Sequence, residues 1–177
     1  MASAGSSPNP TPAISDFERN LLFGEWWSAE ARSRYFAFLA GRFSRNNQVV
    51  TFLSLLLSSG AVGAILADPH IVRGFIWVKL GLPAGSAAIS ALSLVRQYSK
   101  RTLDCSQLYG EWASIAGECR ELWGEMYESS APERLKALLK RGPEISKRVA
   151  GSIGNYRGLM KRCEDEAENE IRRYTGA

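Results

Sequence analysis

Histidine and cysteine are scarce in this chain, which argues against two common kinds of site. The 177 residues include one histidine, His70, and three cysteines, Cys105, Cys119 and Cys163. An ordinary zinc site needs several such ligands, so no metal is expected. An odd number of cysteines without CxxC spacing does not fit a disulfide scaffold. We interpret the three as small apolar core residues in a reducing cytoplasm.

Motifs of the common catalytic sites are absent as well. The sequence contains no G-x-x-x-x-G-K-[ST] loop, no nucleophile elbow and no paired carboxylates in an apolar setting. We therefore expect neither enzymatic activity nor a cofactor. The net charge is a modest +4, and no basic run is interleaved with aromatic residues. Nucleic acid is not an expected partner, whereas anionic lipid explains the basic surplus.

Charged residues are missing from one long stretch, 46–67, which reads NNQVVTFLSLLLSSGAVGAILA. As a helix this stretch would span about 33 Å, against about 30 Å for the hydrocarbon core of a bilayer. A second apolar stretch, 74–95, is interrupted only by Lys79, and Asp68-Pro69 ends the first helix. Together, 46–95 predict a two-helix transmembrane hairpin. A buried hairpin inside a soluble helical module is the alternative.

Residues 1–14 are small, polar and proline-rich, and we predict a disordered tail. Ser15 or Asp16 can cap an amphipathic helix over 15–45, rich in aromatic residues and arginine. Its aromatic residues suit either the lipid headgroup layer or packing on later helices. The candidate interfacial anchors are Trp77, Lys79, Arg42 and Arg45.

Basic residues lie mainly outside the predicted hairpin. Four arginines lie between residues 32 and 45, and three basic residues lie between 96 and 101. By the positive-inside rule, both termini are expected in the cytoplasm.

Small and hydroxylated residues mark the two predicted spans, where they suit close helix packing or the lining of a water-filled pore. These candidates are Ser54, Ser58, Ser59, Gly60, Gly63, Ser86 and Ser90.

Residues 96–177 predict a cytoplasmic helical bundle or antiparallel coiled coil, so the predicted fold class is all-α. The second span is expected to continue as a helix beyond Val95, and Gly142-Pro143 is expected to end a short helix that begins at Pro132. Apolar residues at spacings of three and four predict two packed seams. The seam residues are Leu108, Trp112, Ile115, Leu122, Met126, Ile153, Tyr156 and Met160.

The order of these features resembles a known family. Three segments carry the resemblance: RSRYFAFLAGRFSRNN, IWVKLGLPAGSAAISALSLV and YGEWASIAGECRELW. They are similar to the SLATT family, the SMODS- and SLOG-associating two-transmembrane effectors of bacteria, over roughly residues 29–123.

The resemblance implies a non-enzymatic, homo-oligomeric effector in the bacterial inner membrane. Such an effector would permeabilise or depolarise the membrane in anti-phage defence, when triggered by a partner protein or a cyclic nucleotide. The family has no catalytic residues to transfer. The alternative is a membrane-anchored coiled-coil scaffold that recruits a cytoplasmic partner and forms no pore.

Overall fold

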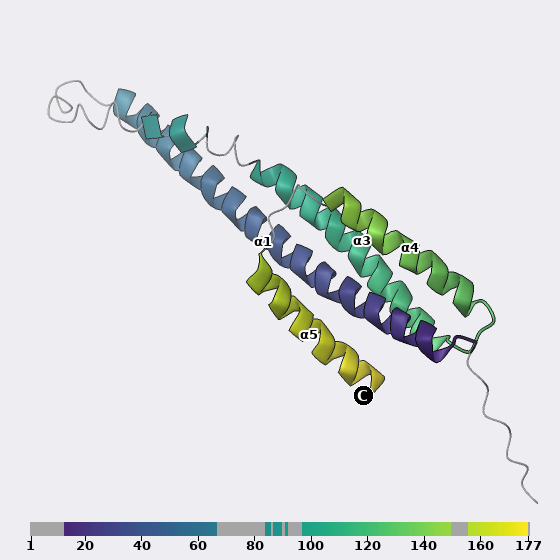
Figure 1. Cartoon of the computed structure of the whole chain (residues 1–177). Helices are drawn as coiled ribbons and strands as arrows, with labels where there is room; N and C mark the ends of the chain where they lie inside the picture. The colour runs from purple at the N-terminus through teal and green to yellow at the C-terminus, as the bar shows by residue number, and fades with distance from the viewer. Residues whose placement is uncertain are drawn as a thin grey trace, which may run out of the picture. The chain divides into compact units, whose positions relative to one another are not determined.

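The chain is all-helical, as the sequence predicts. The computed structural model describes residues 13–66, 84–85, 87–89, 91, 97–149 and 156–176. Most of them belong to four helices (Figure 1): α1 (Asp16–Leu66), α3 (Tyr98–Gly124), α4 (Ala131–Val149) and α5 (Arg157–Thr175). These described residues contain no strand.

Two compact units divide the chain. We call the unit formed by Met1–Ala37 and Gln107–Ala177 the bundle, and the unit Phe38–Ser106 the apolar unit. α1 and α3 contribute residues to both units. The contacts described below lie within one unit or the other.

A capping box starts α1. Ser15 Oγ accepts a hydrogen bond from the backbone N–H of Glu18 at 3.3 Å, and the Ser15 backbone N–H donates to Glu18 Oε2 at 2.8 Å. This reciprocal pair satisfies donors that a helix start leaves without partners. The same bonds lower the pKa of Glu18 below its ordinary value. The predicted helix start at Ser15 or Asp16 is confirmed.

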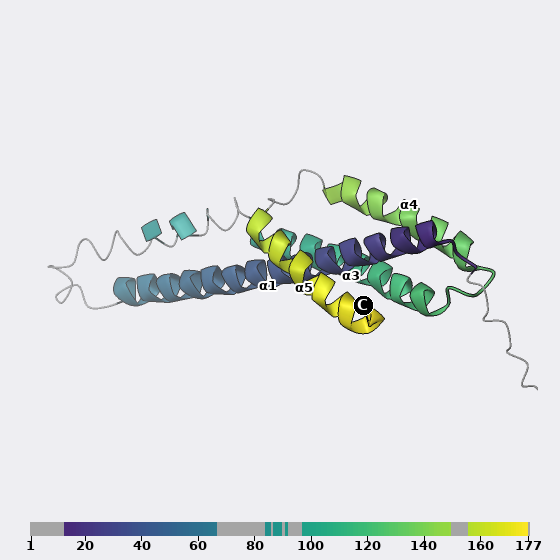
Figure 2. The same cartoon turned by 60° about the horizontal axis from the view of Figure 1, so that its bottom comes forward.

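The bundle is built on a core of aromatic and aliphatic side chains from all four helices. Trp26 of α1 and Trp112 of α3 are each only 1% exposed. α3, α4 and α5 run alongside the first half of α1 (Figures 1 and 2). Other buried members of this core are Leu22, Ala29, Ile115, Cys119, Leu122, Leu135, Ile145, Cys163, Ala167 and Ile171.

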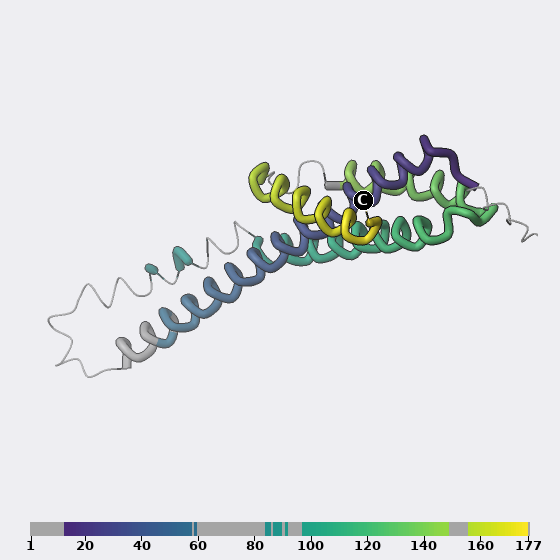
Figure 3. Tube along the Cα trace, turned by 90° about the horizontal axis from the view of Figure 1, so that it is seen from below, coloured from purple at the N-terminus to yellow at the C-terminus, as the bar shows by residue number. Residues whose placement is uncertain are grey.

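α3 and α4 are antiparallel, as their traces show in Figure 3. Two ion pairs join them, Arg141–Glu118 and Arg148–Glu111, and a third joins Arg134 of α4 to Glu125, the residue that follows α3. Successive arginines on α4 are seven residues apart, and their glutamate partners are seven residues apart in the opposite direction. The ion pairs therefore follow the heptad repeat that brings the same helix face back every two turns.

α4 continues through Gly142-Pro143, so the prediction that these residues end a helix is wrong. Glycine lacks the Cβ that normally clashes with the ring of a following proline. Pro143 lacks the N–H that would donate a helical hydrogen bond, but residues before and after Pro143 attach α4 to the rest of the bundle. Leu138 and Ile145 are buried, and Arg141 and Arg148 pair with α3. Packing across the proline outweighs the lost hydrogen bond.

Two further boundaries differ from the prediction. Gln97 has a φ of 45°, and α3 begins at Tyr98, so the predicted continuous helix beyond Val95 is interrupted there. The left-handed backbone of Gln97 cannot be part of an α-helix.

The predicted disordered tail extended to residue 14, but Ile14 is only 3% exposed and the Ala13 N–H donates to the Met126 carbonyl. Residues 1–12 lie outside the described residues.

The predicted transmembrane hairpin receives no support from the described residues. Within them, no helix is both long enough and apolar enough to span a bilayer. The first predicted span, 46–67, forms the second part of α1 up to Leu66. Of the second span, 74–95, the structure describes 84–85, 87–89 and 91, all of them helical.

Candidate functional site

An exposed apolar face on α1 distinguishes the apolar unit. Phe52 is 61% exposed and Leu55 is 65% exposed, and three neighbouring apolar residues are also exposed: Val49, Leu53 and Leu56. With 3.6 residues per turn, these five side chains cover roughly half of the helix circumference. Contiguous exposed apolar surface of this kind marks a membrane or protein interaction site.

The other side of the same α1 segment is more covered. Val50, Ser54 and Leu57 are half-buried. A Cβ atom added to Gly85 would lie 3.8 Å from Leu57 Cδ1, which is ordinary van der Waals distance. The second apolar stretch therefore approaches α1 closely at Leu57. Within the apolar unit, α1 has one face against this stretch and one face that is open.

The candidate span residues are only partly described. Ser54 is half-buried, and Ser59 is exposed and donates from Oγ to the Leu56 carbonyl of its own helix at 3.0 Å. Gly60 and Gly63 belong to α1. The side chain of Ser58 and the residues Ser86, Ser90, Trp77 and Lys79 lie outside the described part. Arg42 and Arg45 are exposed on α1, just before the apolar face.

The predicted seam residues fall into two groups. Leu108, Trp112, Ile115 and Leu122 are buried on α3. Met126 and Met160 are half-buried, and Ile153 lies outside the described residues. Tyr156 was predicted in the seam, but it precedes α5 and is 41% exposed, so this placement is wrong. The buried residues of α5 recur at spacings of four: Cys163, Ala167 and Ile171.

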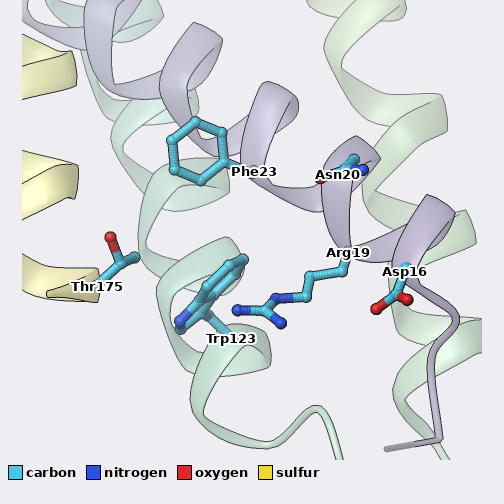
Figure 4. A pocket seen from close by; sticks show the side chains of 6 residues that line it. All are labelled: Asp16, Arg19, Asn20, Phe23, Trp123 and Thr175. Atoms are coloured by element: carbon cyan, nitrogen blue, oxygen red, sulfur yellow. The ribbon is translucent and has the colours of Figure 1, made fainter. Parts of the chain in front are cut away.

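A pocket of about 360 Å³ lies in the bundle where α1, α3 and α5 meet (Figure 4). Its aromatic wall is formed by Phe23 and Trp123, whose ring centroids are 6.2 Å apart. The Arg19 guanidinium lies over the Trp123 ring, 5.0 Å from its centroid. Asp16, Asn20 and Thr175 complete the lining. An aromatic wall beside a cation, a carboxylate and an amide can hold a small polar ligand.

One oxygen of the Glu25 carboxyl group, Oε1, is buried in the bundle without a hydrogen-bond partner among the described residues. This carboxyl lies against Gly142 of α4, where an added Cβ would collide with it. Burial raises the pKa of Glu25 above its ordinary value of 4.5, and the nearby charge of Arg32 opposes this rise. Arg32 itself donates to Ser146 Oγ at 3.1 Å and lies over the Trp112 ring.

Glu25→Gln is expected to stabilise the bundle at about pH 8, by about 1 kcal/mol, because the charged carboxylate no longer has to be buried. The gain should shrink as the pH falls through the raised pKa and disappear well below 4.5, where Glu25 is neutral in both states. Urea unfolding of the wild-type chain and of the Glu25→Gln variant at several pH values measures this gain in stability. A gain that is independent of pH would contradict the assignment.

The three cysteines are free and buried, as predicted from their spacing. Burial is the main cause that raises the pKa of Cys105 to about 11 and that of Cys119 to about 12. It also raises the pKa of Cys163. Thiols with such values stay protonated at neutral pH and are poor nucleophiles and ligands. Within the described residues, no group of histidine, cysteine and acidic side chains is arranged to hold a metal ion.

Comparison of the chain with models of protein families, with curated proteins and with solved structures gives no match.

Proposed function

We propose that this chain is a non-enzymatic membrane effector whose stretches 46–67 and 74–95 insert into a bilayer as a helical hairpin. The single observation that carries the proposal is the exposed apolar face of α1, which includes Phe52 and Leu55. Burying a large apolar side chain is worth about 1.5–3 kcal/mol. Lipid contact along this face would therefore be strongly favourable.

The resemblance of residues 29–123 to the SLATT family supports the rest of this proposal. The chain would lie in the bacterial inner membrane with both termini in the cytoplasm, and it would oligomerise there. In anti-phage defence it would permeabilise or depolarise the membrane when a partner protein or a nucleotide signal acts on it. The pocket beside Trp123 offers a place for a small-molecule signal.

A ligand can open such an assembly only if it binds one arrangement of the helices more tightly than the other. The bundle contains groups that disfavour its present arrangement, namely Glu25 Oε1 and the indole N–H groups of Trp26 and Trp112, which are buried without hydrogen-bond partners among the described residues. Buried polar groups without partners cost free energy. They therefore reduce the free-energy difference between the present arrangement of the helices and a repacked one.

Carbonate extraction of membranes from cells that express the full chain tests insertion. The wild-type chain should stay in the membrane pellet. The double substitution Phe52→Lys and Leu55→Lys should move it to the supernatant, because a central lysine costs about 2.5–3.5 kcal/mol. Tyr127→Lys adds charge at an exposed bundle position and should have no effect. A wild-type chain found in the supernatant would overturn the proposal.

Dye uptake and membrane potential after expression together with the neighbouring genes test the effector activity. We expect uptake and depolarisation only when the trigger is present. Intact polarisation with a correctly inserted chain would reject pore formation.

A chain that inserts correctly while the membrane stays polarised would favour the second candidate, a membrane-anchored scaffold without a pore. A groove of about 530 Å³ between α1 and α4 supports it, because Phe17 and Leu21 of α1 face Leu135 and Leu139 of α4 there. Phe17 is among the most exposed large apolar residues described. Such a groove can accept an apolar helix of a cytoplasmic partner.

A further inference from the structure

The last helix, α5, is joined to the rest of the bundle by little buried apolar surface. Figures 1 and 2 show it alongside α1. Three of its 19 residues are buried, Cys163, Ala167 and Ile171, and only Ile171 has a large side chain. α4 is equally long but buries two leucines and an isoleucine. Because hydrophobic stabilisation follows the apolar area removed from water, packing holds α5 less tightly than α4.

Ion pairs at the surface supply much of the remaining attachment of α5. Glu170 pairs with Arg34 of α1 and lies 3.9 Å from Arg120 of α3. Glu166 lies 4.0 Å from Arg34. All four side chains are between 30% and 50% exposed. Ion pairs that water can reach contribute little to stability, so they do not make up for the small apolar contact.

Aromatic residues of α1 lie beneath α5. The ring of Tyr174 packs edge-on against Trp26, with 5.4 Å between the ring centroids, and Trp26 is only 1% exposed. The Trp27 indole N–H donates to the Glu164 carbonyl at 3.2 Å. If α5 left, both indoles would lose a contact and part of the Trp26 ring would become exposed. Newly exposed aromatic surface favours a new partner or a repacked arrangement.

We propose that α5 detaches from α1 and α3 as a unit while the rest of the bundle stays folded, and that this is the step that the trigger promotes. The second part rests on the proposed effector function. Few buried apolar contacts and exposed polar contacts are the properties of a segment that opens locally. Thr175 lines the pocket beside Trp123, so that pocket changes when α5 leaves. A signal acts there by binding the released arrangement more tightly.

Thiol labelling of the full chain in detergent tests whether α5 detaches alone. Cys163 is buried on α5, whereas the charged groups that influence the pKa of the buried Cys119 belong to α1, α3 and α4. Alkylation with N-ethylmaleimide, followed by peptide mass spectrometry, gives the rate for each thiol relative to the urea-unfolded chain. Cys163 should react at least about tenfold faster than Cys119. Equal rates with equal dependence on urea would overturn the proposal.

A substitution in α4 separates local detachment from global unfolding. Ile145 of α4 is 5% exposed. Ile145→Val weakens the attachment of α4 whether α5 is bound or released, so it should accelerate Cys119 about fivefold and leave the rate of Cys163 unchanged. Equal acceleration of both thiols would show that α5 leaves only when the whole bundle unfolds, and would reject the proposal.

Two glutamate variants of α5 test the contacts that hold it. Glu170→Gln removes the pairs with Arg34 and Arg120 and should accelerate the labelling of Cys163 about threefold. Glu168→Gln is the matched control, because Glu168 pairs with Arg172 inside α5. It should leave the rate unchanged. Equal rates in the two variants would contradict the role of Glu170.

The same two variants test the link to the effector in cells. With Glu170→Gln, depolarisation should need about a third of the induction of the neighbouring genes that the wild-type chain needs, whereas Glu168→Gln should behave as wild type. An unchanged requirement, in a variant that inserts and whose Cys163 reacts faster, would show that release of α5 is not the triggered step. A chain that fails carbonate extraction would reject the proposed function, but not the local detachment measured in detergent.

Discussion

Trp112→Ala is expected to lower the free energy of unfolding by about 3–5 kcal/mol, the largest effect of any single substitution considered. Trp112 is 1% exposed, and its ring supports the Arg32 guanidinium 4.5 Å from its centroid. Arg32 in turn donates to Ser146 of α4. Alanine would leave a cavity between α1 and α3 and remove the surface that holds Arg32 in position for α4.

Trp112→Phe should cost less, about 1–2 kcal/mol, because it keeps a ring and removes an indole N–H that has no partner within the described part. Tyr109→Ala is the matched control one turn earlier on α3, where the side chain is exposed, and it should change stability by less than about 0.5 kcal/mol. Urea unfolding followed by far-ultraviolet circular dichroism measures all three. A loss below about 1 kcal/mol for Trp112→Ala would show that α3 is not packed as described.

Gly142→Ala should be destabilising by about 1–3 kcal/mol, although alanine is the better helix former. The added Cβ would collide with Glu25 Oε1 and lie 3.3 Å from Glu25 Cδ. Glu25 is a flexible, half-buried side chain that can relieve part of this collision by rotating, but its Oε1 atom is buried, so the rotation disturbs the packing around it. The same measurement of unfolding in urea detects the loss.

A double-mutant cycle makes the cause of this effect specific. With Glu25→Ala already present, the collision with the carboxyl is gone, so the destabilisation by Gly142→Ala should become smaller, while the cost of a Cβ beside the Pro143 ring is the same in both backgrounds. Gly117→Ala is the control, because an added Cβ there meets nothing within 4 Å. It should stabilise the chain in either background. Equal effects of Gly142→Ala in both backgrounds would contradict the contact with Glu25.

Local signals in the sequence predicted much of the helical structure. Ser15 and Glu18 form the capping box that the start of α1 requires. Apolar residues spaced by three and four, such as Leu108 and Trp112, identified the buried face of α3. These features depend on neighbours within about two turns, so one segment of sequence contains the information needed to recognise them.

Tertiary contacts determined the features that the sequence did not predict. α4 passes through Pro143 because flanking residues bind α3, and no local pattern contains that information. Glu25 could have been noticed, since it lies between Leu22 and Ala29 on the buried stripe of α1. Its position against Gly142 could not, because the two residues are far apart in the sequence.

The candidate sites also combine features that the local sequence predicted with features that only tertiary contacts determine. The absence of charge from 46–67 predicted the apolar character of the face that includes Phe52. The arginines Arg42 and Arg45 indicated a basic border beside it. The hydrogen bond from Ser99 to Asn47 was not predicted, because serine and asparagine are common on helix surfaces. Only the pairing of α1 with α3 places Asn47 beside Ser99.

The arginine–glutamate ladder between α3 and α4 makes the attachment of α4 sensitive to ionic strength. Its charged side chains are partly exposed, so dissolved ions can reach them. The screening length falls from about 8 Å at physiological salt to about 3 Å at 1 M. In concentrated salt, α4 would be held mainly by its narrow apolar stripe. The attachment of α4 to α3 should therefore weaken as the salt concentration rises.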